Sequence, residues 1–189
     1  MVRVALIRSV FLSCAVLAGM WAQGAGAATN NIVPPGWPKF VTIPSISVRA
    51  PVESLALNRP SDAEAPYKWG DVAWYNRSPR PGDPGRAQIY GHLDSTCCAA
   101  VFYRLKDLKK GNTIQVQYPN GKSLVFAVQW SATYWNKQVP YAFFNQPTTQ
   151  RGLVLITCAG AFHRDGTGYD HKLVVYATLS MPPAHPPHK

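Results

Sequence analysis

A cysteine and a histidine each follow a short strand-like segment, and together they have the chemistry of nucleophilic catalysis. Residues 153–156 are apolar and lead into Thr157 and Cys158, after which come the small residues 159–161. A thiol at the end of a strand beside a loop is rigidly held and yet reachable, as a nucleophile must be. His92 ends the other segment. In acyl transfer a thiolate attacks and a histidine protonates the leaving amine, so the pair supplies two required roles.

A third role in acyl transfer is stabilisation of the oxyanion, which a cation or backbone N–H groups can provide. Downstream of Cys158 the sequence offers basic side chains for it. The alternative for Cys158 is a structural role, because free cysteines are among the most buried residue types. A single cysteine with a distant histidine is a weak signal, so both interpretations stay open on these grounds alone.

The segments that must position these residues are short. Seventeen Pro and fourteen Gly among 189 residues divide the chain into pieces that favour strands over long helices. Short helices or turns are expected at 99–105 and 139–145, and Asn120-Gly121 is typical of a hairpin turn. Seven or eight strands predict a mainly β fold, a closed barrel or a sandwich. The expected strands are 43–52, 71–75, 86–92, 113–118, 123–130, 152–158 and 172–178.

The composition narrows the function classes. With 47% apolar and 15% charged residues, the chain is neither mainly disordered nor a coiled coil. Its formal charge of +10 favours anionic surfaces such as phospholipid or cell-wall polymers. No basic cluster with interleaved aromatic residues and no zinc-finger spacing is present, so we expect no nucleic-acid partner.

The N-terminus has the pattern of an export signal. Arg3 and Arg8 precede the apolar run 9–22, and small residues follow it. A cleaved signal and an uncleaved anchor both fit this length. We therefore expect an extracytoplasmic protein, membrane-anchored through its N-terminus or secreted at the cell surface. The expected organisation is a signal peptide or anchor (1–28), a linker (29–42), a folded domain (43–180) and a Pro/His-rich tail (181–189).

The remaining cysteines have two interpretations. Cys97 and Cys98 are adjacent, and a disulfide between neighbours is strained and uncommon. The favoured interpretation is that both are packing residues in a loop or at the start of a helix. The alternatives are a redox pair or a disulfide to Cys158 that masks it. Asp94 has two interpretations as well, since it would either orient the His92 imidazole or cap a turn.

Two more histidines, His163 and His171, lie downstream of Cys158. With His92 and Cys158 they lack the spacing of a metal site. We therefore expect no metal and no cofactor.

In their order along the chain these motifs resemble the sortases, cysteine transpeptidases of Gram-positive cell surfaces. The motifs are Gly-His-Leu-Asp-Ser at 91–95, Lys-Gly-Asn at 110–112, Leu-Ile-Thr-Cys at 155–158 and Val-Val-Tyr-Ala at 174–177. The class often called E or F is the most similar, because segment 74–85 also matches it. The resemblance spans about 43–179 and implies a closed sortase-type β-barrel of seven to eight strands with one or two short helices.

The resemblance also implies an activity and its partners. A sortase of this kind would cleave a Leu-Pro-X-Thr-Gly-like sorting signal at the C-terminus of a surface protein. It would hold the acyl group as a cysteine thioester and pass it to an amine of a cell-wall precursor or a pilin.

The resemblance assigns a role to each candidate residue. Cys158 would be the nucleophile, His92 the general acid and then base, and Thr157 would shape the substrate pocket. The family's third catalytic residue is an arginine on or before the last strand, and here the sequence departs from the pattern. Arg164 is the favoured candidate for the oxyanion, with Lys172 as the alternative. This departure keeps a second reading open, a catalytically impaired sortase-like or β-barrel module that binds a surface ligand.

Overall fold

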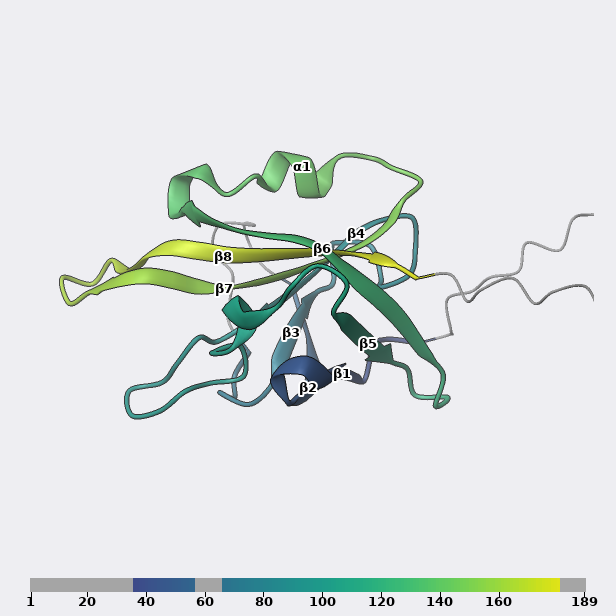
Figure 1. Ribbon diagram of the computed structural model, residues 1–189, viewed down its shortest axis with the longest axis horizontal. Coiled ribbons are helices and arrows are strands. Elements are labelled where there is room, and N and C mark those ends of the chain that lie inside the picture. Colours follow the sequence, from purple (N-terminus) through teal and green to yellow (C-terminus); the bar gives the residue numbers. More distant parts are fainter. Residues whose placement is uncertain (1–35, 57–65, 181–189) are drawn as a thin grey trace, which may run out of the picture. The chain divides into compact units, whose positions relative to one another are not determined.

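The structure is a computed structural model that describes residues 36–56 and 66–180 (Figure 1). The chain divides into a unit of residues 1–30 and a unit of residues 31–189, and all described residues belong to the second. The expected leader (1–28), the first half of the expected linker (29–35) and the tail (181–189) lie outside the described residues.

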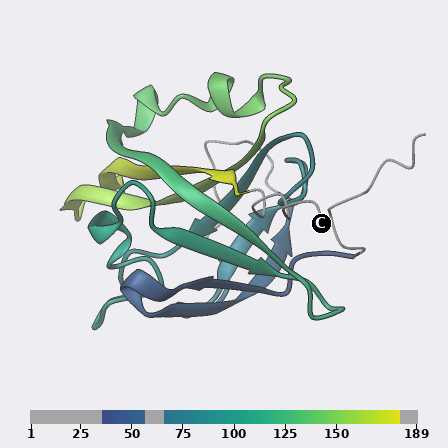
Figure 2. The same cartoon turned by 45° about the vertical axis from the view of Figure 1, so that its right-hand side comes forward.

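Eight strands close into a barrel in the order β1-β2-β3-β4-β7-β8-β6-β5 (Figures 1 and 2). Most neighbours are antiparallel, but β2 with β3 and β4 with β7 are parallel. The prediction of a closed, mainly β barrel is therefore confirmed. The strands are β1 (Phe40–Ile43), β2 (Val48–Leu55), β3 (Val72–Tyr75), β4 (Gly85–Gly91), β5 (Thr113–Gln117), β6 (Ser123–Trp135), β7 (Arg151–His163) and β8 (Gly168–Leu179).

Local departures from the expected strands have local causes. The expected strand 43–52 is interrupted by a 3-10 turn, Pro44–Ile46, and Ser47 ends this turn with a left-handed φ of 58°. The proline and this backbone reversal divide the segment into β1 and β2.

The helical content is small. The helix expected near 139–145 is present as α1 (Tyr141–Asn145), but 99–105 forms turns before the 3-10 turn Leu105–Asp107. A further 3-10 turn is Asn136–Gln138. None of the helices in 36–56 and 66–180 is long and apolar enough to cross a bilayer.

Side chains alternate between two cores along the central strands. On β7, Leu153 and Leu155 point into the barrel, whereas Val154 and Ile156 point outward and pack beneath α1. Phe144 of α1 is fully buried in this outer cluster. Each such burial stabilises the fold by about 1.5–3 kcal/mol. This alternation determines on which face the following residues of β7 lie. The side chains that continue its outer row lie on the face that α1 partly covers (Figure 1).

Candidate active site

Cys158 and Lys172 meet on the outer face of β7 and β8. The two strands are antiparallel, and Cys158 is the direct cross-strand partner of Lys172. The Nζ of Lys172 donates a hydrogen bond to the Sγ of Cys158 at 3.2 Å. Both residues continue the row that holds Ile156 on β7 and Val174 on β8, which are buried under α1. The thiol therefore lies at the edge of the outer core with a primary ammonium beside it.

His92 reaches the same face from β4. The strand is parallel to β7, with Tyr90 in register with Ile156. Continued two residues beyond the end of β4, this register would align His92 with Cys158, and the two-residue period would put both side chains outside the barrel. The β4–β7 pairing thus favours the expected proximity of this histidine and this cysteine.

The imidazole of His92 is held by the segment before β3. Its Nε2–H donates to the backbone carbonyl of Pro66, with 2.9 Å between nitrogen and oxygen. The indole of Trp69 lies against the ring, with 4.2 Å between centroids. Because a carbonyl oxygen can only accept, this contact places the proton on Nε2 and leaves Nδ1 as the second nitrogen.

Asp94 fixes the loop after His92 rather than its imidazole. The Tyr169 hydroxyl on β8 donates to the Asp94 carboxylate. This hydrogen bond is the main cause that raises the pKa of Tyr169 to about 12. The loop is further tied back by the Phe102 N–H, which donates to the His92 carbonyl at 2.9 Å. The histidine loop and β8, which carries Lys172, are therefore linked directly.

Cys158 opens into a cavity of about 470 Å³. Tyr141 of α1 lines it, and burial together with the nearby Cys158 raises the pKa of this phenol to about 12. Tyr141 and Tyr169 therefore stay protonated at neutral pH, and both can donate hydrogen bonds. The lining residues are Asn136, Lys137, Tyr141, Cys158, Thr167, Gly168, Tyr169 and Lys172.

Thr157 lies on the other side of the strand. Its cross-strand partner is Leu173, a residue of the barrel interior, and it is only 2% exposed. The hydroxyl is buried, and the described residues offer it no hydrogen-bond partner. The structure therefore places Thr157 beneath the site and outside the cavity that Cys158 lines.

The sequence analysis favoured Arg164 as the cation beside the thiol, but the side chain in contact with the thiol is that of another residue. It lies in the turn between β7 and β8, where it is exposed, and it does not line the Cys158 cavity. The cation on the thiol is Lys172. The hairpin register gives the reason, because residue 172, and not residue 164, is the cross-strand partner of residue 158.

A bulge follows Cys158 and replaces the expected loop. β7 continues to His163, but its register with β8 shifts between Ala159 and Phe162. Gly160 has a φ of +82°, and a Cβ there would lie 2.1 Å from an oxygen of Asp170. Only glycine fits at this point. The expectation that Cys158 ends its strand was wrong, because this bulge bends the strand without ending its pairing.

The carboxylate of Asp170 holds the bulge together. It accepts from the Nδ1–H of His171 at 2.6 Å, from the backbone N–H of Ala161 at 2.9 Å and from His163 at 3.3 Å. The hydrogen bond from His171 is the largest of the causes that lower the pKa of Asp170 to about 2. Lys172 follows these two residues directly, so this network fixes the strand that presents the ammonium.

The adjacent cysteines form no disulfide with Cys158. Cys97, Cys98 and Cys158 are all free thiols, and the first two are exposed. Hydrogen bonds from the Cys98 thiol and from Ser95 lower the pKa of Cys97. Within 36–56 and 66–180 no three or more His, Cys, Asp or Glu side chains group so that they could hold a metal ion.

The sequence matches the family model of the sortase domain over residues 41–180. The chain belongs to the sortase family. It is accordingly a sortase-type cysteine transpeptidase, and the free thiol beside a cation is consistent with that chemistry. No curated protein sequence matches it.

Solved sortases have the same fold. Sortase C-1 from Actinomyces oris has a TM-score of 0.58 and 21% identity, covering 76% of this chain and 73% of its own. Sortase A from Corynebacterium diphtheriae has a TM-score of 0.58 and 18% identity, with coverages of 82% and 66%. Sortase C1 from Streptococcus suis has a TM-score of 0.59 and 19% identity, with coverages of 78% and 74%. At these identities the likeness concerns the fold.

Sequence reasoning missed several residues around the thiol. Tyr141, Tyr169 and the Asp170 network carried no recognisable motif, although Tyr169 and Asp170 stand just before Lys172. Trp69 was missed as well, since it lies 23 residues before His92 and only the fold brings the two rings together.

Proposed function

We propose that this sortase cleaves the Thr–Gly bond of a Leu-Pro-X-Thr-Gly-like sorting signal and transfers the threonyl acyl group to an amine of a cell-wall precursor or a pilin. The observation that carries the proposal is the 3.2 Å contact between Lys172 and Cys158 on the face that also holds His92. It brings a nucleophile and a cation to one point and a proton donor to the neighbouring strand end.

The reaction proceeds in two halves. The Cys158 thiolate attacks the threonine carbonyl carbon, and the carbonyl oxygen becomes an oxyanion. His92 protonates the leaving glycine amine as the C–N bond breaks, which leaves a thioester on Cys158. In the second half His92 accepts a proton from the incoming amine, the new amide forms, and the thiolate leaves.

We assign the stabilisation of the oxyanion to Lys172 rather than to Arg164. An ammonium that contacts the sulfur in the resting site is well placed to donate to an oxygen on the carbon that this sulfur attacks. Lysine acts here as a point charge and lacks the planar fork of arginine. The neutral phenol of Tyr141, which lines the same cavity, supplies a second donor.

Thr157 supports the site from below in this proposal. Its side chain fills the barrel interior under the strand that carries Cys158, so it holds the thiol in place without contacting the sorting signal.

Finer features of the proposal come from the sequence. The motifs at 91–95 and 155–158 are most similar to class E or F sortases, and the segment 1–28 has the pattern of an export signal or anchor. We infer an enzyme on the outer side of the membrane, where the charge of +10 would favour contact with anionic wall polymers.

A quenched fluorescent peptide containing Leu-Pro-X-Thr-Gly tests the proposal. Purified protein should release fluorescence. Where breakdown of the thioester is the slow step, release should be faster when an amine acceptor such as triglycine is added. Cys158→Ala and His92→Ala should be inactive while their circular dichroism matches wild type. Equal cleavage by wild type and Cys158→Ala would overturn the proposal.

Two observations favour a second candidate, a sortase-like module that binds a surface ligand without turnover. His92 is engaged by Pro66 and Trp69, and lysine stands in place of arginine. In that case the peptide would bind to wild type and to Cys158→Ala with equal affinity, and neither protein would cleave it.

A further inference from the structure

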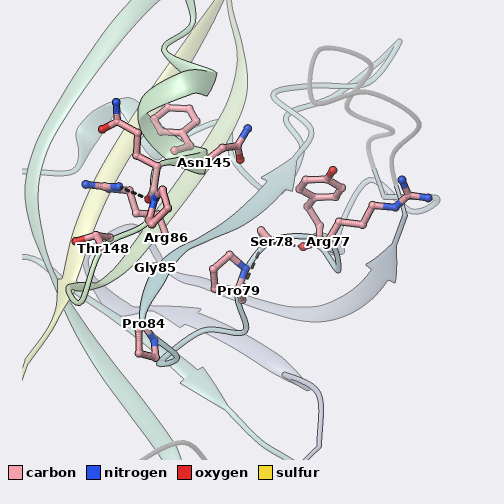
Figure 3. A pocket seen from close by; sticks show the side chains of 12 residues that line it. Arg77, Ser78, Pro79, Pro84, Gly85, Arg86, Asn145 and Thr148 are labelled. Carbon is pink, nitrogen blue, oxygen red and sulfur yellow. Dashed lines mark hydrogen bonds between the residues drawn. The ribbon is translucent and has the colours of Figure 1, made fainter.

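A second cavity lies where the β3–β4 connection meets the end of α1 (Figure 3). Its volume is about 460 Å³, and it shares no lining residue with the Cys158 cavity. Neither aspartate nor glutamate is among the residues that line it. The proposed transpeptidation assigns no role to this cavity.

The cavity contains a buried arginine without an acidic partner. Arg86, near the start of β4, is 6% exposed, and no described carboxylate forms a salt bridge with it. Its stem passes over Gly152 of β7, where a Cβ would come within 3.0 Å of the arginine Cγ. A buried cation without a counter-ion is costly, so the unpaired charge calls for an explanation.

The guanidinium uses only one of its nitrogens in contacts with the described residues. Nη1 donates to the carbonyl of Phe143 at 2.9 Å and to that of Gln146 at 3.3 Å, and the group lies 3.8 Å from the Phe143 ring centroid. Nε is buried and has no hydrogen-bond partner. Nη2 forms no hydrogen bond with the described residues and, unlike Nε, is not a buried unpaired atom, so it is the nitrogen that remains to pair with an oxygen of a carboxylate.

Two more donors stand on the cavity wall. The Oδ1 of Asn145 accepts from Gln88 at 3.0 Å, which leaves the Nδ2 hydrogens of Asn145 free to donate. The Oγ1 of Thr148 accepts from the backbone N–H of Gln150 at 3.2 Å, which leaves the hydroxyl hydrogen free. Figure 3 shows Thr148 on the side of the Arg86 guanidinium, whereas the Asn145 amide lies on the other side of the end of α1 and the Arg77 side chain extends away from both.

We propose that this cavity binds a small carboxylate, which pairs with the free Nη2 of Arg86 and accepts hydrogen bonds from the Thr148 and Asn145 donors on the cavity wall. Its volume exceeds that of one carboxylate group, so it also accommodates the short carbon chain of a small organic acid. The site is independent of Cys158 and does not rest on the proposed substrate.

Titration of the ¹⁵N-labelled full chain tests this inference at the arginine itself. The Arg86 Nε–Hε resonance is assigned by its loss in Arg86→Lys, and it is followed during additions of acetate, succinate, N-acetylglutamate and inorganic phosphate at constant ionic strength. We expect a saturable shift with the carboxylates, both in wild type and in Cys158→Ala.

Asn145→Asp is the matched variant. Asn145 is exposed, and aspartate keeps the oxygen that accepts from Gln88, so the fold should persist. The added charge should weaken carboxylate binding about tenfold. Three outcomes would overturn the proposal: no saturable shift of Arg86, binding of phosphate more tightly than of every carboxylate, or unchanged affinity in Asn145→Asp. In the first case Arg86 only fastens the end of α1 to β4.

Discussion

The ammonium of Lys172 and the sulfur of Cys158 are 3.2 Å apart because the two residues are direct partners across β7 and β8. This relationship decides which basic side chain serves the thiol. The pairing of Cys158 with Lys172 also depends on the bulge between Ala159 and Phe162, since the bulge shifts the register of β7 against β8.

Removal of the Lys172 ammonium should impair catalysis far more than removal of the turn arginine. Lys172→Ala should lower kcat/KM by about 10²–10³, the usual effect of losing one oxyanion donor. Arg164→Ala is the matched control and should stay within about twofold of wild type, as exposed substitutions generally do. Lys172→Arg should keep part of the activity because it retains a cation. The reverse pattern, with a large loss only in Arg164→Ala, would show that Arg164 and not Lys172 stabilises the oxyanion.

The Tyr141 phenol should contribute a single hydrogen bond to the bound substrate or to its oxyanion. Tyr141→Phe should therefore lower kcat/KM by about tenfold, which is the value of one neutral hydrogen bond. Tyr169→Phe breaks the contact with Asp94 and should also alter the loop that carries His92. Steady-state kinetics of both variants, with thermal denaturation as a check of the fold, separate the two effects. An unchanged Tyr141→Phe enzyme would exclude the phenol from the reaction.

The Asp170 network predicts a pH dependence of stability. The pKa of Asp170 is lowered from 3.8 to about 2 in the folded protein. A lowered pKa stabilises the fold above about 3.8, and this contribution is lost as the pH falls toward 2. Asp170→Asn should therefore have a lower Tm than wild type at pH 5–7, and the two should converge as the pH falls below about 4. A Tm difference that persists unchanged to pH 2 would contradict this role of the carboxylate.

The buried hydroxyl of Thr157 should be dispensable for the fold. Thr157→Val replaces an unpaired oxygen with a methyl group of similar size, so the free energy of unfolding should rise by about 1 kcal/mol. Because the side chain faces the barrel interior, KM for the peptide should not change. Urea denaturation and peptide kinetics measure the two quantities. A marked rise in KM would instead show that Thr157 contacts the sorting signal.

The sequence indicated the barrel and proposed two candidate site residues for clear physical reasons. Short strands between Pro- and Gly-rich turns predicted a barrel or a sandwich, the resemblance to sortases implied the closed barrel, and that fold was confirmed. His92 and Cys158 were proposed as partners because each follows a strand-like segment. These features are local or periodic, so they can be read from the sequence.

Features that depend on cross-strand register could not be read in this way. The placement of Lys172 opposite Cys158 depends on a bulge at Gly160, because the register of Phe162 and Tyr169, continued without it, would pair Cys158 with Leu173. Nothing in the residue types 159–163 states how many residues the bulge inserts. The inward direction of Thr157 follows from the period of two once Cys158 is placed outside. The contact of Trp69 with His92 depends on long-range packing between the segment before β3 and the end of β4.

Mass spectrometry of the intact protein after incubation with a Leu-Pro-X-Thr-Gly peptide tests the central claim most directly. We predict an adduct whose mass equals the peptide up to its threonine acyl group, which maps to Cys158, disappears in Cys158→Ala and is released by hydroxylamine as a thioester. It should accumulate much more slowly in Lys172→Ala than in Arg164→Ala. An adduct on another residue, or none in a wild-type protein that cleaves the peptide, would contradict the assignment of Cys158 as the nucleophile.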